Sequence, residues 1–152
     1  MNVTLHTASL ADATRIADIL IASRAVFLPY APSPHSDASV RAWVRDVLLP
    51  RERVTVATLA GQQVGVLAMH HTDGIGWITQ LYLDPPNVGR GIGSLLLAHA
   101  LAELPRPIRL FAFQQNHGAR RFYERNGFVP VQFTDGSGNE EHCPDVLYQL
   151  DG

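Results

Sequence analysis

The segment LYLDPPNVGRGIGSLLLAHAL, residues 81–101, constrains the fold more than any other part of the chain. An alternating apolar strand runs into two prolines, a glycine-rich stretch and an apolar helix, so one strand must turn directly into one helix. The first backbone amides of that helix have no acceptor within it, and glycines leave them unshielded. Because the helix dipole also favours negative charge there, the segment predicts a phosphate or pyrophosphate site. A plain strand-to-helix turn of the same composition is the alternative.

A dinucleotide-binding loop is a second alternative for this segment. That loop requires the spacing G-x-G-x-x-G inside a unit of two parallel strands and a helix. Here Gly89, Gly91 and Gly93 have the spacing G-x-G-x-G, and Leu96 stands where the third glycine would fall. The preceding strands are also predicted to be antiparallel, so we discount a dinucleotide site.

Turn residues and hydrophobic periodicity divide the rest of the chain into strands and helices. Strands are predicted at 3–5, 53–59, 63–71, 76–84, 108–113, 128–133 and 145–150. Helices are predicted after the caps Ser9 and Asn116, from Ser36 or Asp37 to Pro50, and over 92–104. This order of elements indicates an α+β fold. We expect a mixed, mainly antiparallel sheet of about seven strands flanked by four helices.

Composition limits the size and the partners of the protein. With 152 residues, of which 46% are hydrophobic, we expect one domain spanning residues 1–152. The chain has 12 basic and 14 acidic residues, a net charge of −2, which argues against a nucleic-acid partner. Every basic residue is arginine, which excludes a phosphate-loop lysine and a Schiff-base lysine.

Cysteine, histidine and hydropathy patterns exclude further classes. Cys143 is the only cysteine, so neither an intramolecular disulfide nor a cysteine-based zinc cluster can form. The histidines are too scattered for a recognisable metal site, and we expect no metal. The N-terminal segment has no basic leader, and no apolar run reaches the roughly 18 residues of a membrane helix. We therefore expect a cytoplasmic protein without a membrane partner.

Two segments resemble the motifs of one enzyme family. Gly91 and Gly93 match the last two fixed positions of the cofactor-binding motif of the GNAT superfamily of N-acetyltransferases. Val88 stands where Gln or Arg is usual, a position that contributes largely through its backbone. The segment NHGARRFYERNGF, residues 116–128, is similar to the second motif, in which an Asn opens a helix and an aromatic pair closes it. The predicted order of elements also resembles the family from the first strand to the last.

This resemblance implies acetyl-CoA as the acyl donor and a set of residues that bind it. Backbone groups of one strand would pair with the pantetheine arm, and amides of the glycine loop would hold the pyrophosphate. Arg90 would add a charge to a phosphate, and Asn116 would bind near the pantetheine. The implied cofactor-binding residues are Leu81, Tyr82, Leu83, Val88, Gly89, Arg90, Gly91, Ile92, Gly93, Ser94, Asn116 and Tyr123.

The resemblance also makes Tyr123 the catalytic general acid that protonates the departing thiolate. A phenol with an ordinary pKa of about 10 is protonated at neutral pH and can donate that proton. The alternative is that the Tyr123 ring is simply packed on its helix face.

The general base is less defined. In many relatives it is a glutamate on the strand before the glycine loop, but Gln80 on that strand cannot accept a proton usefully. The remaining candidates are His70, His71, Asp73, Glu140 and Glu141.

The segment between the first two helices lies where the family builds its variable acceptor pocket. The residues expected to bind the acceptor are Tyr30, His35, Asp37, Trp43, Gln80 and Glu141. A helix cap would explain Asp37 without a ligand, and core packing would explain Trp43.

The expected function is acetyl-CoA-dependent N-acetyl transfer to an amine of a small molecule or peptide. Direct attack in a ternary complex is expected because Cys143 lies in the wrong segment for an acyl relay. The alternative is a non-catalytic module that senses acyl-CoA. Homodimers are common among similar proteins, but nothing in the sequence fixes an interface.

Overall fold

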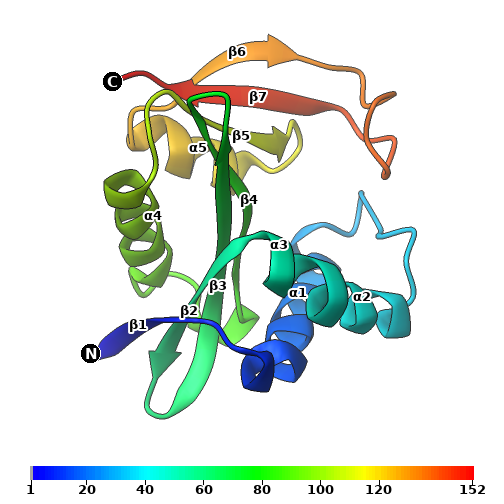
Figure 1. The fold of residues 1–152 in the computed structure, drawn as a ribbon. Coiled ribbons are helices and arrows are strands. Elements are labelled where there is room, and N and C mark those ends of the chain that lie inside the picture. Colours follow the sequence, from blue (N-terminus) through cyan, green and yellow to red (C-terminus); the bar gives the residue numbers. More distant parts are fainter. Residues whose placement is uncertain (1) are drawn as a thin grey trace.

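The computed structural model describes residues 2–152, which form one seven-stranded sheet with helices on both faces (Figure 1). The strands are β1 (Val3–Thr7), β2 (Arg53–Leu59), β3 (Gln62–Thr72), β4 (Ile75–Leu83), β5 (Ile108–Phe113), β6 (Val129–Phe133) and β7 (Asp145–Leu150). The helices are α1 (Ala13–Phe27), α2 (Asp37–Trp43), α3 (Leu49–Arg51), α4 (Ile92–Glu103) and α5 (His117–Arg125), with short turns η1 (Leu10–Asp12), η2 (Val44–Leu48) and η3 (Pro85–Asn87). The predicted α+β fold and its order of elements are confirmed.

The sheet has the strand order β1-β2-β3-β4-β5-β7-β6. All neighbouring strands are antiparallel except β4 and β5, which are parallel and pair only at Gly76–Ile108 and Trp77–Arg109. Beyond Trp77 the two strands have no paired residues. Within residues 2–152, the backbone of β4 from Ile78 to Leu83 therefore has no strand partner on its β5 side.

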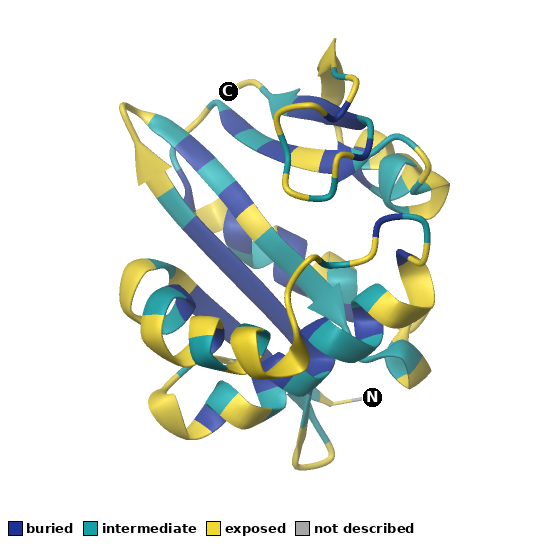
Figure 2. Cartoon of the chain, turned by 90° about the vertical axis from the view of Figure 1, so that its right-hand side faces the viewer, coloured by how far each residue is buried: buried dark blue, intermediate teal, exposed yellow. Residues whose placement is uncertain are grey.

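Two hydrophobic cores cover the two faces of the sheet. One core packs α1 and η2 against the middle strands through residues such as Ile16, Leu20 and Val66. The other packs α4 and α5 through residues such as Leu96 and Phe128. The middle parts of β2 and β3 are therefore buried, whereas most of β4 is only partly buried and the outer faces of the helices are exposed (Figure 2).

The hairpin turns form where the sequence predicts them. Ala60–Gly61 joins β2 to β3, and Asp73–Gly74 joins β3 to β4. Asp73 and Gly74 both have positive φ angles, 52° and 78°, as tight two-residue hairpin turns require. These turns set the antiparallel register of the strands that carry the site.

The predicted end of the second helix at Pro50 is wrong. The helical segment continues from Asp37 through Pro50 to Arg51, and it includes the π-helical turn η2, where the Leu49 amide donates to the Val44 carbonyl. Pro50 is tolerated because it lies in the first turn of α3, where a missing N–H breaks no bond within that short helix. Ser36, rather than Asp37, is the N-cap of α2, since its hydroxyl accepts from the Ser39 amide.

Candidate active site

A cavity of about 650 Å³ opens where β4 and β5 diverge. One wall is the stretch of β4 from Ile78 to Tyr82, and the opposite wall is the stretch of β5 from Leu110 to Phe113. Asn116 and Tyr123 close the α5 side. Because the facing backbone of β4 is unpaired here, the cavity presents hydrogen-bonding groups along one wall and apolar side chains along the other.

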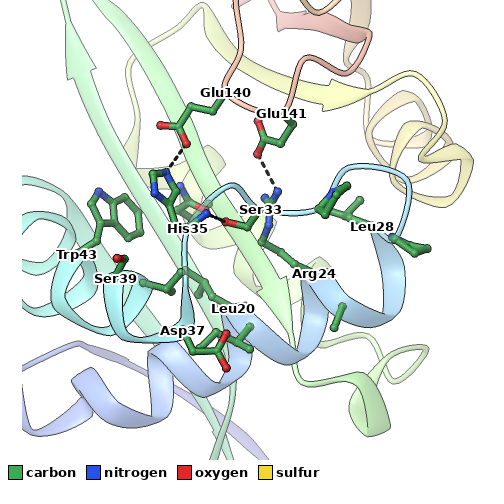
Figure 3. A pocket seen from close by; sticks show the side chains of 16 residues that line it. Leu20, Arg24, Leu28, Ser33, His35, Asp37, Ser39, Trp43, Glu140 and Glu141 are labelled. Atoms are coloured by element: carbon green, nitrogen blue, oxygen red, sulfur yellow. Dashed lines mark hydrogen bonds and ion pairs between the residues drawn. The ribbon is translucent and has the colours of Figure 1, made fainter.

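A second cavity of about 700 Å³ lies between α1, the segment 28–40 that leads into α2, and the loop before β7 (Figure 3). Leu20, Leu28 and Val40 give it apolar walls, while its rim carries polar and charged groups. The two cavities share four lining residues: Arg24, Leu28, Gln80 and Glu141. A ligand in one cavity therefore lies beside a ligand in the other.

Five of the six residues expected to bind the acceptor line this second cavity: His35, Asp37, Trp43, Gln80 and Glu141. Trp43 is partly exposed to it rather than packed in the core. Tyr30 is not among its lining residues. The Tyr30 ring packs edge-on against Phe113 with centroids 6.3 Å apart, and its hydroxyl is buried without a partner in the part of the chain that the structure describes.

An ion pair and a histidine–carboxylate contact connect the N-terminal and C-terminal walls of this cavity (Figure 3). Arg24 Nη2 lies 2.7 Å from Glu141 Oε2, and His35 Nε2 lies 2.7 Å from Glu140 Oε2. Arg24 also donates to the Tyr82 hydroxyl at 3.3 Å and to the Ala31 carbonyl at 3.2 Å. Burial opposes the charge of Arg24, but Tyr82 and Glu141 together raise the pKa of its guanidinium above the ordinary value. Arg24 therefore stays charged and holds α1, β4 and the loop before β7 together.

The glycine loop has the geometry expected of an anion site. Gly91 is the N-cap of α4 and has a φ of +82°, a conformation that residues with a side chain rarely adopt. No side chain caps α4, and its first amides lie at the open end of the helix. Arg90 is exposed and forms no ion pair with any residue in 2–152. Within the predicted stretch Val88 to Ser94, the first amides of α4 are thus open donors and Arg90 is an unpaired positive charge, while the Val88 amide donates to the Pro85 carbonyl at 3.4 Å.

Asn116 and Tyr123 both line the first cavity, and both also make contacts that stabilise the fold. Asn116 caps α5 as predicted, with its Oδ1 accepting from the Ala119 amide at 3.2 Å, so its Nδ2 remains free to donate. The Tyr123 ring packs against Phe122 and Phe128, with centroids 5.3 and 5.8 Å away. Burial, with a smaller effect of Tyr82, raises the pKa of the Tyr123 phenol well above its ordinary value. The phenol is therefore protonated at neutral pH, and Tyr123 is both a packed aromatic and a possible donor.

The predicted base candidates do not lie together. His71 and Asp73 are exposed near the β3–β4 turn, and neither lines the two cavities. Glu140 and Glu141 line the second cavity but are paired with His35 and Arg24. His70 is not among the residues that line either cavity and contacts Glu52, with Nδ1 2.7 Å from Glu52 Oε2. Sequence reasoning missed Arg24 and Glu52, because neither belongs to a motif and each is brought to the site by packing alone.

Comparison with known proteins identifies the family. The sequence profile described as "Acetyltransferase (GNAT) family" matches residues 20–128, most of the chain. The chain therefore belongs to the GNAT acetyltransferase family, as its two motifs predict. The comparison with curated proteins gave no match.

Solved structures of the same fold include complexes with coenzyme A and acetyl-CoA. The PaiA N-acetyltransferase of Thermoplasma acidophilum, in complex with coenzyme A, is 19% identical with a TM-score of 0.81, and all of both chains (100%) is covered. YncA of Salmonella typhimurium, with its cofactor acetyl-CoA, is 20% identical with a TM-score of 0.76, covering 99% of this chain and 94% of that one. Apo YjaB of Escherichia coli is 22% identical with a TM-score of 0.77, covering 100% and 99%.

Two negative observations apply to residues 2–152. They contain no group of three or more His, Cys, Asp or Glu side chains that could hold a metal ion. Within the same range, no helix combines the length and the apolar character that crossing a membrane requires.

The Arg24–Glu141 pair is expected to stabilise the fold measurably, because both side chains are largely buried, with exposed fractions of 20% and 15%. Replacing either residue alone, as Arg24→Met or Glu141→Gln, leaves the partner unpaired and should lower the free energy of unfolding by about 1–3 kcal/mol. The double variant should lose less than the sum, with a coupling of at least about 1 kcal/mol in urea unfolding. The exposed pair Arg41–Asp18 is the control, for which the same cycle should give no measurable coupling. Additive losses at Arg24 and Glu141 would contradict this prediction.

Proposed function

We propose that this protein transfers the acetyl group of acetyl-CoA to the nitrogen of an amine by direct attack. The observation that carries the proposal is that three features follow one another along the chain and in space. They are the open N-terminal end of α4 at Gly91, the unpaired backbone of β4, and the two cavities that meet at Gln80. A long donor molecule with a phosphate at one end and a reactive thioester at the other fits such a path.

The donor is recognised by backbone groups for most of its length. The amides from Val88 to Ser94 and the Arg90 guanidinium hold the pyrophosphate, because the α4 N-terminus offers donors and a favourable dipole. Backbone groups of Leu81, Tyr82 and Leu83 pair with the pantetheine arm as a further strand would, since β5 leaves that edge free. Asn116 donates to the same arm through Nδ2, the group that its helix cap does not use.

The amine enters through the second cavity. Its apolar walls suit the carbon body of an amine, and Gln80 lies on the wall common to both cavities, where acceptor and thioester meet. His35, Asp37, Trp43 and Glu141 line the rest of the acceptor's path.

Direct attack is favoured because the chain offers no suitable nucleophile for a covalent acyl relay. Cys143 is 5% exposed and is not among the residues that line either cavity. Burial, together with Glu141 and Asp145, raises the pKa of its thiol, so little of it is in the nucleophilic thiolate form.

Tyr123 acts as the general acid in this proposal. It lines the first cavity, and its raised pKa keeps the phenol protonated until the carbon–sulfur bond breaks. The departing thiolate then takes the phenol proton, which makes coenzyme A a better leaving group.

A transfer assay tests the proposed activity directly. The protein should release free coenzyme A from acetyl-CoA faster when an amine from a panel of arylamines, alkylamines and peptide N-termini is added, with a matching acetylated amine in the mass spectrum. Calorimetry should show binding of acetyl-CoA. Tight binding of acetyl-CoA with no transfer to any amine would instead identify a non-catalytic acyl-CoA sensor.

The glycine loop is tested by Gly91→Val. A branched side chain at φ +82° distorts the turn that aims the first amides of α4, so affinity for coenzyme A should fall at least about 10-fold in calorimetry. The matched control is Gly74→Val, which imposes the same strain at φ +78° but at the opposite end of β4, and it should leave affinity unchanged. Leu96→Met, in the fully buried core, should also leave affinity unchanged. Equal affinity of folded Gly91→Val and wild type would refute the assignment.

The role of Tyr123 is tested by Tyr123→Phe, which keeps the ring and removes only the hydroxyl. If the phenol protonates the thiolate, the single-turnover rate of acetyl transfer should fall roughly 10²-fold while affinity for acetyl-CoA and stability are retained. Single-turnover conditions are needed because slow product release would hide the effect. A wild-type rate would leave Tyr123 as a packed aromatic.

A further inference from the structure

Three polar side chains form a cluster, and one of them, Thr79, lines the first cavity. Thr79 Oγ1 donates to Glu52 Oε1 at 2.6 Å, and His70 Nδ1 lies 2.7 Å from Glu52 Oε2. Glu52 directly precedes β2, His70 lies in β3 and Thr79 in β4, so the cluster exists only in the folded sheet. The Glu52 side chain is 15% exposed, and both of its oxygens accept hydrogen bonds.

Thr79 connects this cluster with the cavity because of an irregularity in β4. The pairing of β3 with β4 shifts between Ala68 and Met69: Met69 pairs with Ile78, whereas Ala68 pairs with Gln80. Thr79 is therefore the extra residue of a β-bulge, which turns it out of the regular ladder. It is exposed and lines the same cavity as Tyr123, while its hydroxyl remains bonded to Glu52.

We propose that Glu52 accepts, through Thr79, the proton that the amine loses during acetyl transfer. This inference rests on the acetyltransferase function proposed above. The Thr79 hydroxyl lies 2.6 Å from Glu52 Oε1 and 3.2 Å from the Ala68 carbonyl, and the shorter contact is the one to which it gives its proton. A hydroxyl oxygen has lone pairs of its own, so Thr79 can take a proton from the amine while passing one on. His70 orients the carboxylate so that Oε1 faces Thr79, and it is a positioning residue.

The protons and bonds of the step balance. The amine nitrogen forms a bond to the acetyl carbon, the carbon–sulfur bond breaks, and the thiolate takes the Tyr123 proton. The nitrogen gives one proton to Thr79 Oγ1, whose own proton moves to Glu52 Oε1. Glu52 later releases that proton to water and Tyr123 regains one from water, so the net reaction is amine plus acetyl-CoA to amide plus coenzyme A.

The other carboxylates near the cavities suit this role less well. The Glu141 carboxylate is already bound by the Arg24 guanidinium at 2.7 Å and joins α1 to the loop before β7. Glu140 is 67% exposed and is paired with His35 on the outer rim. Gln80, beside Thr79 on β4, is an amide and cannot accept the proton.

The charged groups around Glu52 are few. On β3 the group that contacts it is His70, and β4 contributes the neutral Thr79. The neighbouring arginine Arg53 is paired with Glu103 at 3.5 Å. On the preceding helical segment, Arg45 is paired with Asp46 at 2.9 Å, and the exposed Arg51 adjoins Glu52 in the chain.

The test compares pH profiles of single-turnover transfer for wild type, Glu52→Gln, Thr79→Val and Thr79→Ser. At pH 7, Glu52→Gln and Thr79→Val should each lose roughly 10²-fold in rate with unchanged affinity for acetyl-CoA, whereas Thr79→Ser, which keeps the hydroxyl, should stay within about threefold of wild type. The deficit of both impaired variants should shrink as pH rises, because hydroxide replaces the missing acceptor. Glu103→Gln, which removes a paired glutamate from α4, is the matched control and should follow the wild-type profile.

Any of the following outcomes would overturn the proposed proton transfer from the amine through Thr79 to Glu52, called the relay below. A wild-type rate for Glu52→Gln at pH 7 would do so, as would a deficit that is equal at every pH, since a merely structural role predicts the latter. Loss of activity in Thr79→Ser equal to that in Thr79→Val would show that the hydroxyl is not the connecting group. Failure of the wild type to transfer acetyl to any amine would instead overturn the proposed function, and the relay with it.

Discussion

The end of hydrogen bonding between β4 and β5 after Trp77 is the constraint on which the rest of the molecule depends. A seven-stranded sheet in which every strand is paired along its whole length would have no cavity between its central strands. Here β4 and β5 separate from each other after two residue pairs, while each stays paired with its other neighbour, and the unpaired edge of β4 needs a substitute partner. The helices α4 and α5 then cover one face around this opening, and α1 with η2 covers the other. The site is thus a break in the sheet that the two cores hold open.

A charged side chain of the second cavity, Arg24, connects the elements around the gap between β4 and β5. Arg24 reaches from α1 to the Tyr82 hydroxyl on β4 and to Glu141 in the loop before β7, so one guanidinium joins three parts of the chain. A buried charge is stable only when it is well paired, and the three acceptors of Arg24 meet most of that requirement. Its remaining Nε has no partner within residues 2–152.

The sequence predicts the local features and misses those that depend on register. Capping by Asn116, the turn at Asp73–Gly74 and the glycine loop follow from neighbouring residues alone, and all three form as expected. The end of the second helix was misplaced, because a π-helical turn moves Pro50 to the start of a new helical turn, where it is tolerated. Tyr30 was assigned to the acceptor pocket by its position in the chain, but its ring packs on Phe113. The contact between Glu52 and Thr79 depends on one extra residue in β4, which no periodicity reveals.

The two proposed binding sites are built from different segments of the chain, which has a consequence for redesign. Beside α1, much of the wall of the second cavity comes from the segment 28–40 and from Glu140 and Glu141 in the loop before β7, whereas the glycine loop and the free edge of β4 lie outside both segments. Under the proposed function, a graft of these segments changes which amine is accepted and leaves the acetyl-CoA site intact. His35 with Glu140 links the two segments across the cavity, whereas Glu141 is paired with Arg24 of α1, so a transplant must keep the first contact within the graft and the second with the remaining helix. The two segments form one exchangeable unit, although about 100 residues separate them in the chain.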